Sequence, residues 1–237
     1  MKLLFRGTTG STLYGTDNAD SDVDYGEVYL EKPEAMLGVD PIGKLSHLVS
    51  DDNDRQRHWL HRWCYLCMKG NPNVLEYLFI PESLIEEVHP LFKELFLDDP
   101  TIFLFRKGLF KAHHGFADQQ IVKMTKGNDA GWKRKQYVAK YGYDIKFAAH
   151  ALRLMFQLKE IASTGTVIYP YEEGMRNQIL EVRNGHLTLD EFKAAYAVLK
   201  AEVIALEDKS YPHIQDEWDS TEVNARLLQF YKEVWDF

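Results

Sequence analysis

The sequence predicts an α+β protein, with a small mixed sheet and flanking helices followed by a mainly α-helical second half. Two observations support this prediction. The first hundred residues hold short apolar or alternating runs, bounded by turn residues, which is the pattern of strands. After about Phe103, the apolar residues recur instead at helical spacing over long segments. We therefore predict two domains, residues 1–103 and residues 104–237, with the second closing a cleft against the first.

The composition is typical of a globular protein and excludes several classes. The 237 residues are 45% hydrophobic and carry a formal charge of −8, which argues against non-specific coating of nucleic acid or of an anionic membrane. A local basic groove is still compatible with that total. Cys64 and Cys67 make no disulfide framework, so a reducing compartment is expected. Without a signal peptide or a long apolar run, we expect a cytoplasmic protein with no membrane partner.

The elements of the first part follow from its turn residues. "KLLF" before the glycine-rich "RGTTGS" predicts a short buried strand that ends in a turn, and "TLYG" predicts a brief helix. The alternating "VDYGEVYL" predicts a second strand. "DRQRHW" is ambiguous, and we interpret it as a third, polar strand that passes into a helix near Trp59. We expect one helical turn in "PEAMLGVDPIGK" and short helices in "NVLEYLF" and "SLIEEVHPLFKELFLDD".

The second half carries its apolar residues at helical spacing. The helical segments are "FRKGLFKAHHGFADQQIVKMTK", "YGYDIKFAAHALRLMFQLKEIAS", "TLDEFKAAYAVLKAEVIALEDKS" and "TEVNARLLQFYKEVWDF". "GNDAGWKRKQ" is the most loop-like connection between them. The sequence shows no internal repeat and no low-complexity tract, so a repeat architecture is excluded.

A pair of carboxylates marks the candidate site. Asp22 and Asp24 lie two residues apart, so they project from the same face if "SDVDYG" is a strand. Two carboxylates on one face repel each other unless a cation lies between them, and Mg²⁺ is commonly held by carboxylates together with substrate phosphates. The turn at Gly10 and Ser11 would let backbone N–H groups approach a phosphate. The pattern predicts a site for a Mg²⁺-bound nucleoside triphosphate, and the alternative is a solvated acidic turn.

The stretch "GSTLYGTDNADSDVDYGEVYL" resembles the signature of the DNA polymerase β-like nucleotidyltransferase superfamily, a Gly-Ser turn followed by D-x-D. The closer resemblance is to a bacterial and phage family of predicted nucleotidyltransferases. "MKGNPNVLEYLF", "GYDIKFAAHALRL" and "RNQILEVRNGHLTLDEF" are similar to later segments of that family, although Gly26 follows D-x-D slightly early. The resemblance covers nearly the whole chain and is specific for family, but it says much less about substrate.

The superfamily resemblance implies a third carboxylate on a neighbouring strand. The candidates are Asp51, Asp52 and Asp54. We favour Asp54, because it opens the most strand-like part of its segment and precedes "GNP" at a distance that fits the family. "RQRHW" is more polar than an alternating strand, which leaves the choice of third ligand open.

The resemblance also implies the chemistry, which is transfer of a nucleoside monophosphate from an NTP to an acceptor hydroxyl, with release of pyrophosphate. Asp22, Asp24 and Asp54 would hold Mg²⁺ or Mn²⁺. Gly10, Ser11 and Tyr14, which belong to the Gly-Ser motif, would lie at the nucleotide. The acceptor is left open among an RNA 3′ end, a protein hydroxyl and a small molecule, and we favour an RNA end such as that of tRNA.

A polar stripe is expected on the helix in "GYDIKFAAHALRL". Tyr143, Lys146, His150 and Arg153 are spaced three or four apart and would share one face. Such a stripe suits a triphosphate or an RNA phosphate, and we assign Lys146, then His150 and Arg153, to the nucleotide. The alternative is a solvated face with routine charges.

Two further motifs carry weaker hypotheses. The basic run from Lys133 to Lys140 includes Tyr137 and suits single-stranded nucleic acid, or else is a solvated turn. In "GNPNVLE", Asn73 and Glu76 have the spacing of a capping box, which favours a structural role. The family resemblance hints instead that Asn71 or Glu76 lines the cleft.

Two other classes of protein are weighed against the transferase. A catalytically degenerate nucleotidyltransferase fold would act as a nucleotide-binding antitoxin or regulatory partner, but the intact Gly10, Ser11, Asp22 and Asp24 argue against it. A phosphohydrolase that uses the same metals would carry His-Asp ligand pairs, and the first fifty residues place none well. The sequence leaves open the base preference, the choice between Mg²⁺ and Mn²⁺, the oligomeric state and the pathway.

Overall fold

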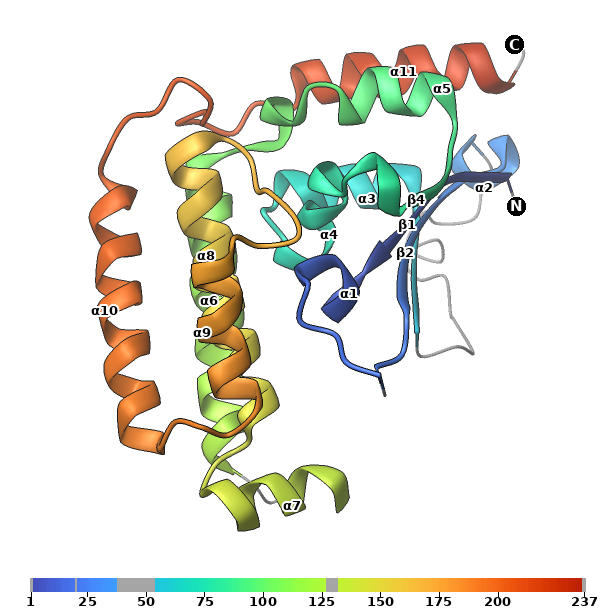
Figure 1. Cartoon of the computed structure of the whole chain (residues 1–237). Helices are drawn as coiled ribbons and strands as arrows, with labels where there is room; N and C mark the ends of the chain where they lie inside the picture. The colour runs from blue at the N-terminus through green and yellow to red at the C-terminus, as the bar shows by residue number, and fades with distance from the viewer. Residues whose placement is uncertain (1, 20, 38–53, 127–131, 236–237) are drawn as a thin grey trace.

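The computed structural model describes residues 2–19, 21–37, 54–126 and 132–235. It confirms the α+β class, because a mixed sheet with flanking helices forms from the first part and helices dominate the second half (Figure 1). None of the helices in these ranges has the length and apolar character needed to cross a membrane.

Within the described residues, four strands form one sheet in the order β3-β2-β1-β4. The central strand β1 (Lys2–Thr9) pairs antiparallel with β2 (Asp24–Leu30) and with β4 (Ile85–Val88). The ambiguous polar segment does form a strand, β3 (Arg55–Trp59), which runs parallel to β2. Because β2 and β3 are parallel, their first residues lie at the same end of the sheet.

The prediction of helix across "SLIEEVHPLFKELFLDD" is wrong in its first part. Ile85–Val88 forms the edge strand β4, and α-helix begins only at Pro90. Four residues with glutamates in the middle have no periodicity that separates a strand from a helical turn. Charged residues are nevertheless common in an edge strand such as β4, which pairs with a neighbour on one side only.

Short helices connect the strands, and some of them pack against the sheet. They are α1 (Gly10–Tyr14), α2 (Pro33–Leu37), α3 (Leu60–Met68), α4 (Pro72–Leu75), η2 (Glu76–Phe79), η3 (Glu82–Leu84), α5 (Pro90–Phe92), η4 (Lys93–Leu97) and η5 (Pro100–Phe103). The α3 helix begins directly after β3, as predicted, and packs against β2 and β3. Its buried Trp63 lies at 5.2 Å from the ring of Phe92 and 5.5 Å from that of Phe103, which joins these helices into one aromatic core.

The second half is built around one long helix. Its helices are α6 (Arg106–Lys126), α7 (Trp132–Tyr141), α8 (Ile145–Thr164), α9 (Glu173–Arg183), α10 (Leu189–Glu207) and α11 (Thr221–Trp235). The α8 helix packs against α6, α9 and α10, which stand beside it in Figure 1. The Asp144 side chain caps its first turn by accepting hydrogen bonds from the N–H groups of Lys146 and Phe147. The basic run that was expected to be loop-like is instead the helix α7.

The last helix returns to the sheet. The Tyr231 hydroxyl donates a 2.9 Å hydrogen bond to Glu31, and the Trp235 indole donates to the Glu31 carbonyl. Figure 1 shows α11 running towards the side of the molecule where the N-terminus lies. The helical half is therefore anchored on the first part at its far end, and the domain division at residues 103 and 104 stays a prediction.

Gly70, in the turn between α3 and α4, offers a test of the packing. It has a φ of +68°, and a Cβ there would lie 2.7 Å from backbone atoms of Gly108 and Leu109 in α6. We expect Gly70→Ala to lower the free energy of unfolding by about 2 kcal/mol or more, because helix backbone cannot move aside as a flexible side chain can. Urea denaturation followed by circular dichroism measures the change. The control Gly174→Ala, where nothing lies within 4 Å, should be neutral or slightly stabilising, and equal losses in both variants would contradict the close approach.

Candidate active site

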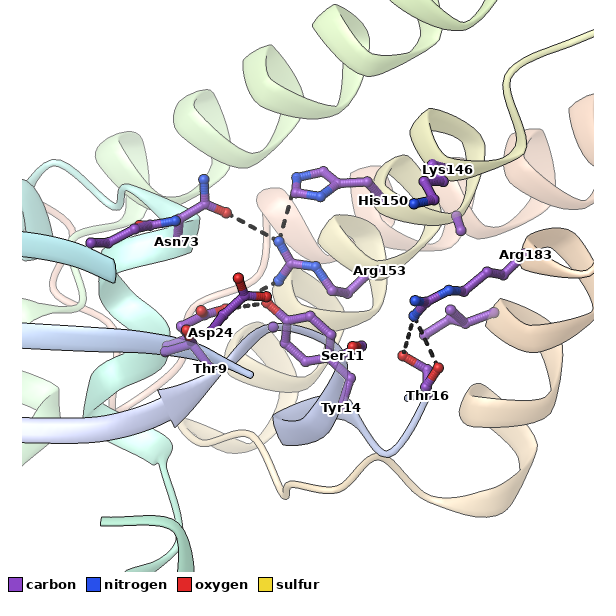
Figure 2. A pocket seen from close by; sticks show the side chains of 15 residues that line it. Thr9, Ser11, Tyr14, Thr16, Asp24, Asn73, Lys146, His150, Arg153 and Arg183 are labelled. Carbon is purple, nitrogen blue, oxygen red and sulfur yellow. Dashed lines mark hydrogen bonds and ion pairs between the residues drawn. The ribbon is translucent and has the colours of Figure 1, made fainter. Parts of the chain in front are cut away.

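A cleft of about 360 Å³ lies between the sheet and the helical half. The first half lines it with Thr9, Gly10, Ser11, Tyr14, Thr16, Asp24, Gln56, Asn73 and Glu76, and the second half with Lys146, Ala149, His150, Arg153, Ile179 and Arg183. Figure 2 shows labelled side chains from α1, α8 and α9 converging on the end of the sheet where Asp24 lies. All the residues predicted for the nucleotide therefore line one cavity.

A second hollow adjoins the cleft on the side of α7. Its volume is about 580 Å³, and it shares Ser11, Asp24, Lys146 and Arg183 with the cleft. Its remaining lining residues are Asn18, Ser21, Asp22, Gln136, Tyr137, Ile145 and Asn184. The two cavities thus meet at Ser11, Asp24, Lys146 and Arg183.

The carboxylates gather where β2 and β3 begin. β2 starts at Asp24, and Asp54 immediately precedes β3. The carbonyl of Asp54 accepts a 2.7 Å hydrogen bond from the N–H of Tyr25, which holds Asp54 beside Asp24. The other candidates for the third carboxylate, Asp51 and Asp52, lie outside the described residues. The parallel register leads Asp54 to the end of the sheet where Asp24 stands, and its role as the third carboxylate stays a prediction.

Asp22 departs from the expected geometry. It lies in the loop before β2, so Asp22 and Asp24 do not share a strand face as their spacing predicted. Both still line the hollow beside the cleft, because the loop turns towards α7. The carboxylates are thus brought together by a loop and two strand ends.

The electrostatics of Asp24 show that these acids interact. Burial raises the pKa of Asp24 above its ordinary value of 3.8, and the nearby charges of Asp54 and Asp22 raise it further. Carboxylate oxygens that repel one another are suitable ligands for a hard divalent cation such as Mg²⁺. Among the described residues, however, no three His, Cys, Asp or Glu side chains already form a group that would hold an ion. Metal binding would therefore require these side chains to turn towards one another.

Gly10 allows the turn after β1 to approach the carboxylate. It has a φ of +66°, and a methyl group at this position would overlap the Asp24 side chain. Ser11 follows it at the start of α1 and lines both cavities. The predicted Gly-Ser pair therefore lies against the Asp24 side chain. Only glycine fits at the first position of the pair.

A buried network ties α8 to the first half (Figure 2). The Arg153 guanidinium lies 3.3 Å from the Glu76 carboxylate and donates a 3.1 Å hydrogen bond to the side chain of Asn73. The Tyr14 hydroxyl donates a 2.7 Å hydrogen bond to Glu76, and the guanidinium carbon lies 4.5 Å from the centre of the Tyr14 ring. Arg153 and Glu76 are only 3% and 4% exposed. Their contacts join four elements, so the network holds the shape of the cleft.

The network shifts the ionisation of its members. Burial raises the pKa of Glu76 to about 7, although Arg153 and the Tyr14 hydroxyl act to lower it. Burial also acts to lower the pKa of Arg153, but Tyr14 and Glu76 outweigh it and raise that pKa above its ordinary value. Tyr14 and Arg153 are thus engaged with Glu76, and their direct contact with a nucleotide stays a prediction.

The predicted stripe on α8 is corrected at Tyr143, whereas His150 lines the cleft as a neutral side chain. Tyr143 precedes the helix, is buried, and donates a hydrogen bond from its hydroxyl to the carbonyl of Leu187. Burial, together with the charges of Arg153 and Lys123, lowers the pKa of His150 to about 3, so its imidazole is neutral at neutral pH. A spacing pattern does not reveal either effect, because both depend on what packs against the helix.

Lys146 keeps its predicted place at the mouth of the cleft. Its ammonium lies 5.7 Å from the centre of the Tyr137 ring in α7, and no carboxylate in the described part of the chain forms a salt bridge with it. Of the basic run on α7, Gln136 and Tyr137 line the hollow, whereas the side chains of Lys133 and Arg134 lie outside the described residues.

Arg183 is the charged residue of the cleft that sequence reasoning missed. Its Nη1 atom donates hydrogen bonds of 2.9 and 3.3 Å to the carbonyl and hydroxyl of Thr16, across 167 positions of sequence. It belongs to a segment that resembles the family, which was the available signal. At the end of α9, however, it has the pattern of a routine cation at a helix C-terminus.

The polar character of β3 also has an explanation. Gln56 lines the cleft, whereas Arg55 and Arg57 point to the other face of the sheet and bind the buried carboxylate of Glu27. Both faces of the strand therefore carry polar partners, and an apolar alternation is not required.

The capping box expected in "GNPNVLE" is wrong. The side chain of Asn71 caps α4 by accepting from the N–H of Asn73, with Pro72 in the first turn. Glu76 turns into the cleft instead, as the family resemblance hinted, and Asn73 accepts from Arg153.

Comparison with known proteins gives one match. Residues 1–217 match the model of the RNA repair pathway DNA polymerase beta family, RlaP. No curated protein and no solved structure matches the chain.

Proposed function

The chain belongs to the RNA repair pathway DNA polymerase beta family, and we propose that it transfers a nucleoside monophosphate from an NTP to a hydroxyl group at an RNA end. One observation carries the proposal: Asp24, which interacts with Asp22 and Asp54, lines the same cleft as the cations Lys146 and Arg183. Family membership supports a polymerase beta-like enzyme, and the family's description favours RNA as the acceptor.

Asp22, Asp24 and Asp54 would hold Mg²⁺ or Mn²⁺ in this proposal. The bound cation would activate the attacking hydroxyl and stabilise the charge on the leaving oxygens. Burial and, to a lesser extent, the charges of Asp54 and Asp22 raise the pKa of Asp24, and a bound cation would offset both effects on the carboxylate.

Lys146, Arg183 and Ser11 would bind the phosphates of the NTP. The Lys146 ammonium has no salt bridge among the described residues, and Ser11 stands beside Asp24 in both cavities. Arg183 uses only its Nη1 atom for Thr16, and a guanidinium has five N–H donors, so donors remain for a phosphate. The acceptor would enter through whichever of the two cavities the nucleotide leaves free, with its hydroxyl brought to Asp24.

The proposal is tested by incubating the protein with each of the four α-labelled NTPs, Mg²⁺ or Mn²⁺, and total RNA or purified tRNA. We expect label in RNA, and we expect Asp22→Asn to reduce it by about a hundredfold or more, because a ligand of the cation is lost. The control Asp17→Asn makes the same charge change at an exposed position of the same loop and should retain activity.

The outcomes separate the competing functions. Label on protein or on a small molecule would retain the transferase and overturn RNA as the acceptor. Binding of NTP without transfer to any acceptor would overturn the enzyme and support the regulatory partner instead.

A further inference from the structure

A third cavity lies on α6, away from the candidate active site. Its volume is about 750 Å³, and none of its described lining residues belongs to the cleft or to the adjoining hollow. On α6, Gly108, Ala112, Gly115 and Gln119 recur on one face and line the cavity. His113 lies on a different face, where it is buried and interacts with Arg153 and Gln157 of α8.

The rim of this cavity is basic. Lys69, Lys107 and Lys111 line it, and no carboxylate in the described part of the chain forms a salt bridge with any of them. The acids that also line it are Asp216, which pairs with Arg106 at 2.7 Å, and Glu217. In a chain of net charge −8, a group of unpaired lysines around one cavity is a local reversal of charge that suits an anionic ligand.

The wall of the cavity is aromatic. The Trp218 ring is 46% exposed and lies 5.3 Å from the buried Phe105 ring. The ammonium of Lys69 lies 4.3 Å from the centre of the Trp218 ring, and Phe116 completes the apolar surface. Such an exposed contact between a lysine and an indole is weaker than the stacking of a base on the same ring, so a base can displace the lysine. The displaced ammonium would then be free for a phosphate.

We propose that this cavity binds single-stranded RNA at nucleotides away from the reacting end. A base would stack on Trp218, and Lys69, Lys107 and Lys111 would contact the flanking phosphates. Single-stranded RNA alternates bases, which stack on an exposed indole, with phosphates, which bind lysines. An acidic peptide carries the negative charges but lacks the bases. The choice of RNA as the ligand rests on the proposed function. The basic rim and the aromatic wall are features of the structure and do not depend on it.

The cavity is close enough to the cleft to serve the same RNA strand. Lys69 lines the cavity and Asn73 lines the cleft, and the two residues are four positions apart in the sequence. Four positions span at most about 14 Å, a distance that a few nucleotides of single-stranded RNA can cover. RNA held here would keep its end near Asp24 without using any residue of the reacting site.

Binding of a labelled 12-nucleotide single-stranded RNA, followed by fluorescence anisotropy, tests the proposal. We expect Trp218→Ala and Lys107→Gln/Lys111→Gln each to weaken binding about tenfold, and Trp218→Phe to retain most of it because a ring remains. The double lysine variant should also reduce the slope of log affinity against log salt by about 1.4. The control Lys32→Gln/Lys193→Gln changes exposed lysines elsewhere and should bind as the wild type does.

Failure of this proposal is distinguishable from failure of the proposed function. Unchanged RNA affinity in Trp218→Ala, with label transfer intact, would overturn the cavity and leave the transferase standing. Lost RNA affinity in Trp218→Ala, with no label transfer even by the wild type, would support the cavity and overturn the transferase. An acidic decapeptide that binds more tightly than the RNA, and loses that affinity in Trp218→Ala, would overturn RNA as the ligand.

Discussion

Asp24→Asn is expected to reduce nucleotidyl transfer by about a thousandfold or more, the largest loss of any single change in the cleft. Asp24 is the acid that borders both cavities and interacts with both Asp22 and Asp54. An amide keeps the shape of the side chain but removes the charge that a cation needs. Label transfer at saturating NTP measures the loss, and activity within tenfold of the wild type would contradict the assignment.

The same variant should be more stable than the wild type when no metal is present. Asp24 has a raised pKa in the folded protein, so its ionised form opposes folding, and the wild type loses stability as the pH rises above 3.8. Removing the charge should raise the midpoint of thermal unfolding by about 1 to 3 °C at pH 7 in EDTA, a small effect because solvent screens a half-buried group. Added Mg²⁺ should stabilise the wild type and not the variant. A destabilised Asp24→Asn protein would show that the acid supports the fold instead.

Arg153→Met is expected to lower the free energy of unfolding by about 3 to 5 kcal/mol at pH 8, the largest effect on stability among these predictions. The change leaves the Glu76 carboxylate buried beside Tyr14 with no cation. The variant should lose less stability at pH 5, because Glu76, whose pKa is already raised to about 7, then carries a proton. The sign follows from linkage, since an acid with a raised folded pKa makes stability fall as the pH rises from 4.5. Urea denaturation at the two pH values measures both effects.

A double-mutant cycle separates the ion pair from simple packing. Glu76→Gln on its own leaves Arg153 buried without its carboxylate and should also destabilise the protein. The combination Arg153→Met/Glu76→Gln removes both charges and should recover a large part of the stability at pH 8. Additive losses would mean that Arg153 stabilises the cleft through packing and its contact with Asn73 rather than through Glu76.

Much of the fold was predictable because its elements carry local signals. β1 ends in a glycine-rich turn and β2 follows an Asp-rich turn, whereas α8 and α10 carry apolar residues at helical spacing, with caps at both ends of α8 and at the start of α10. The edge strand β4 was missed because four residues hold no period. The helix α7 was missed because its segment is polar and follows a glycine-rich connection, so only its packing beside α8 distinguishes it from a turn.

The part of the candidate site that comes from a short sequence motif was predictable. Gly10, Ser11, Asp24 and Lys146 lie together as expected, because a short motif and one helix face present them. His150 lies there too, but as a neutral side chain, because its charge depends on burial and on Arg153 rather than on spacing.

The sequence alone determined which residues are candidates for the proposed chemistry: the Gly-Ser turn, the acids that follow it, and the polar residues of α8. The tertiary structure decided which of them are available. It placed Asp54 beside Asp24 through a parallel strand pair, engaged Arg153 with Glu76, and brought Arg183 to Thr16 from the far end of α9. Local patterns arise from neighbours within a few positions, whereas these contacts join residues from 30 to 167 positions apart, and only the packing of the whole chain brings such residues together.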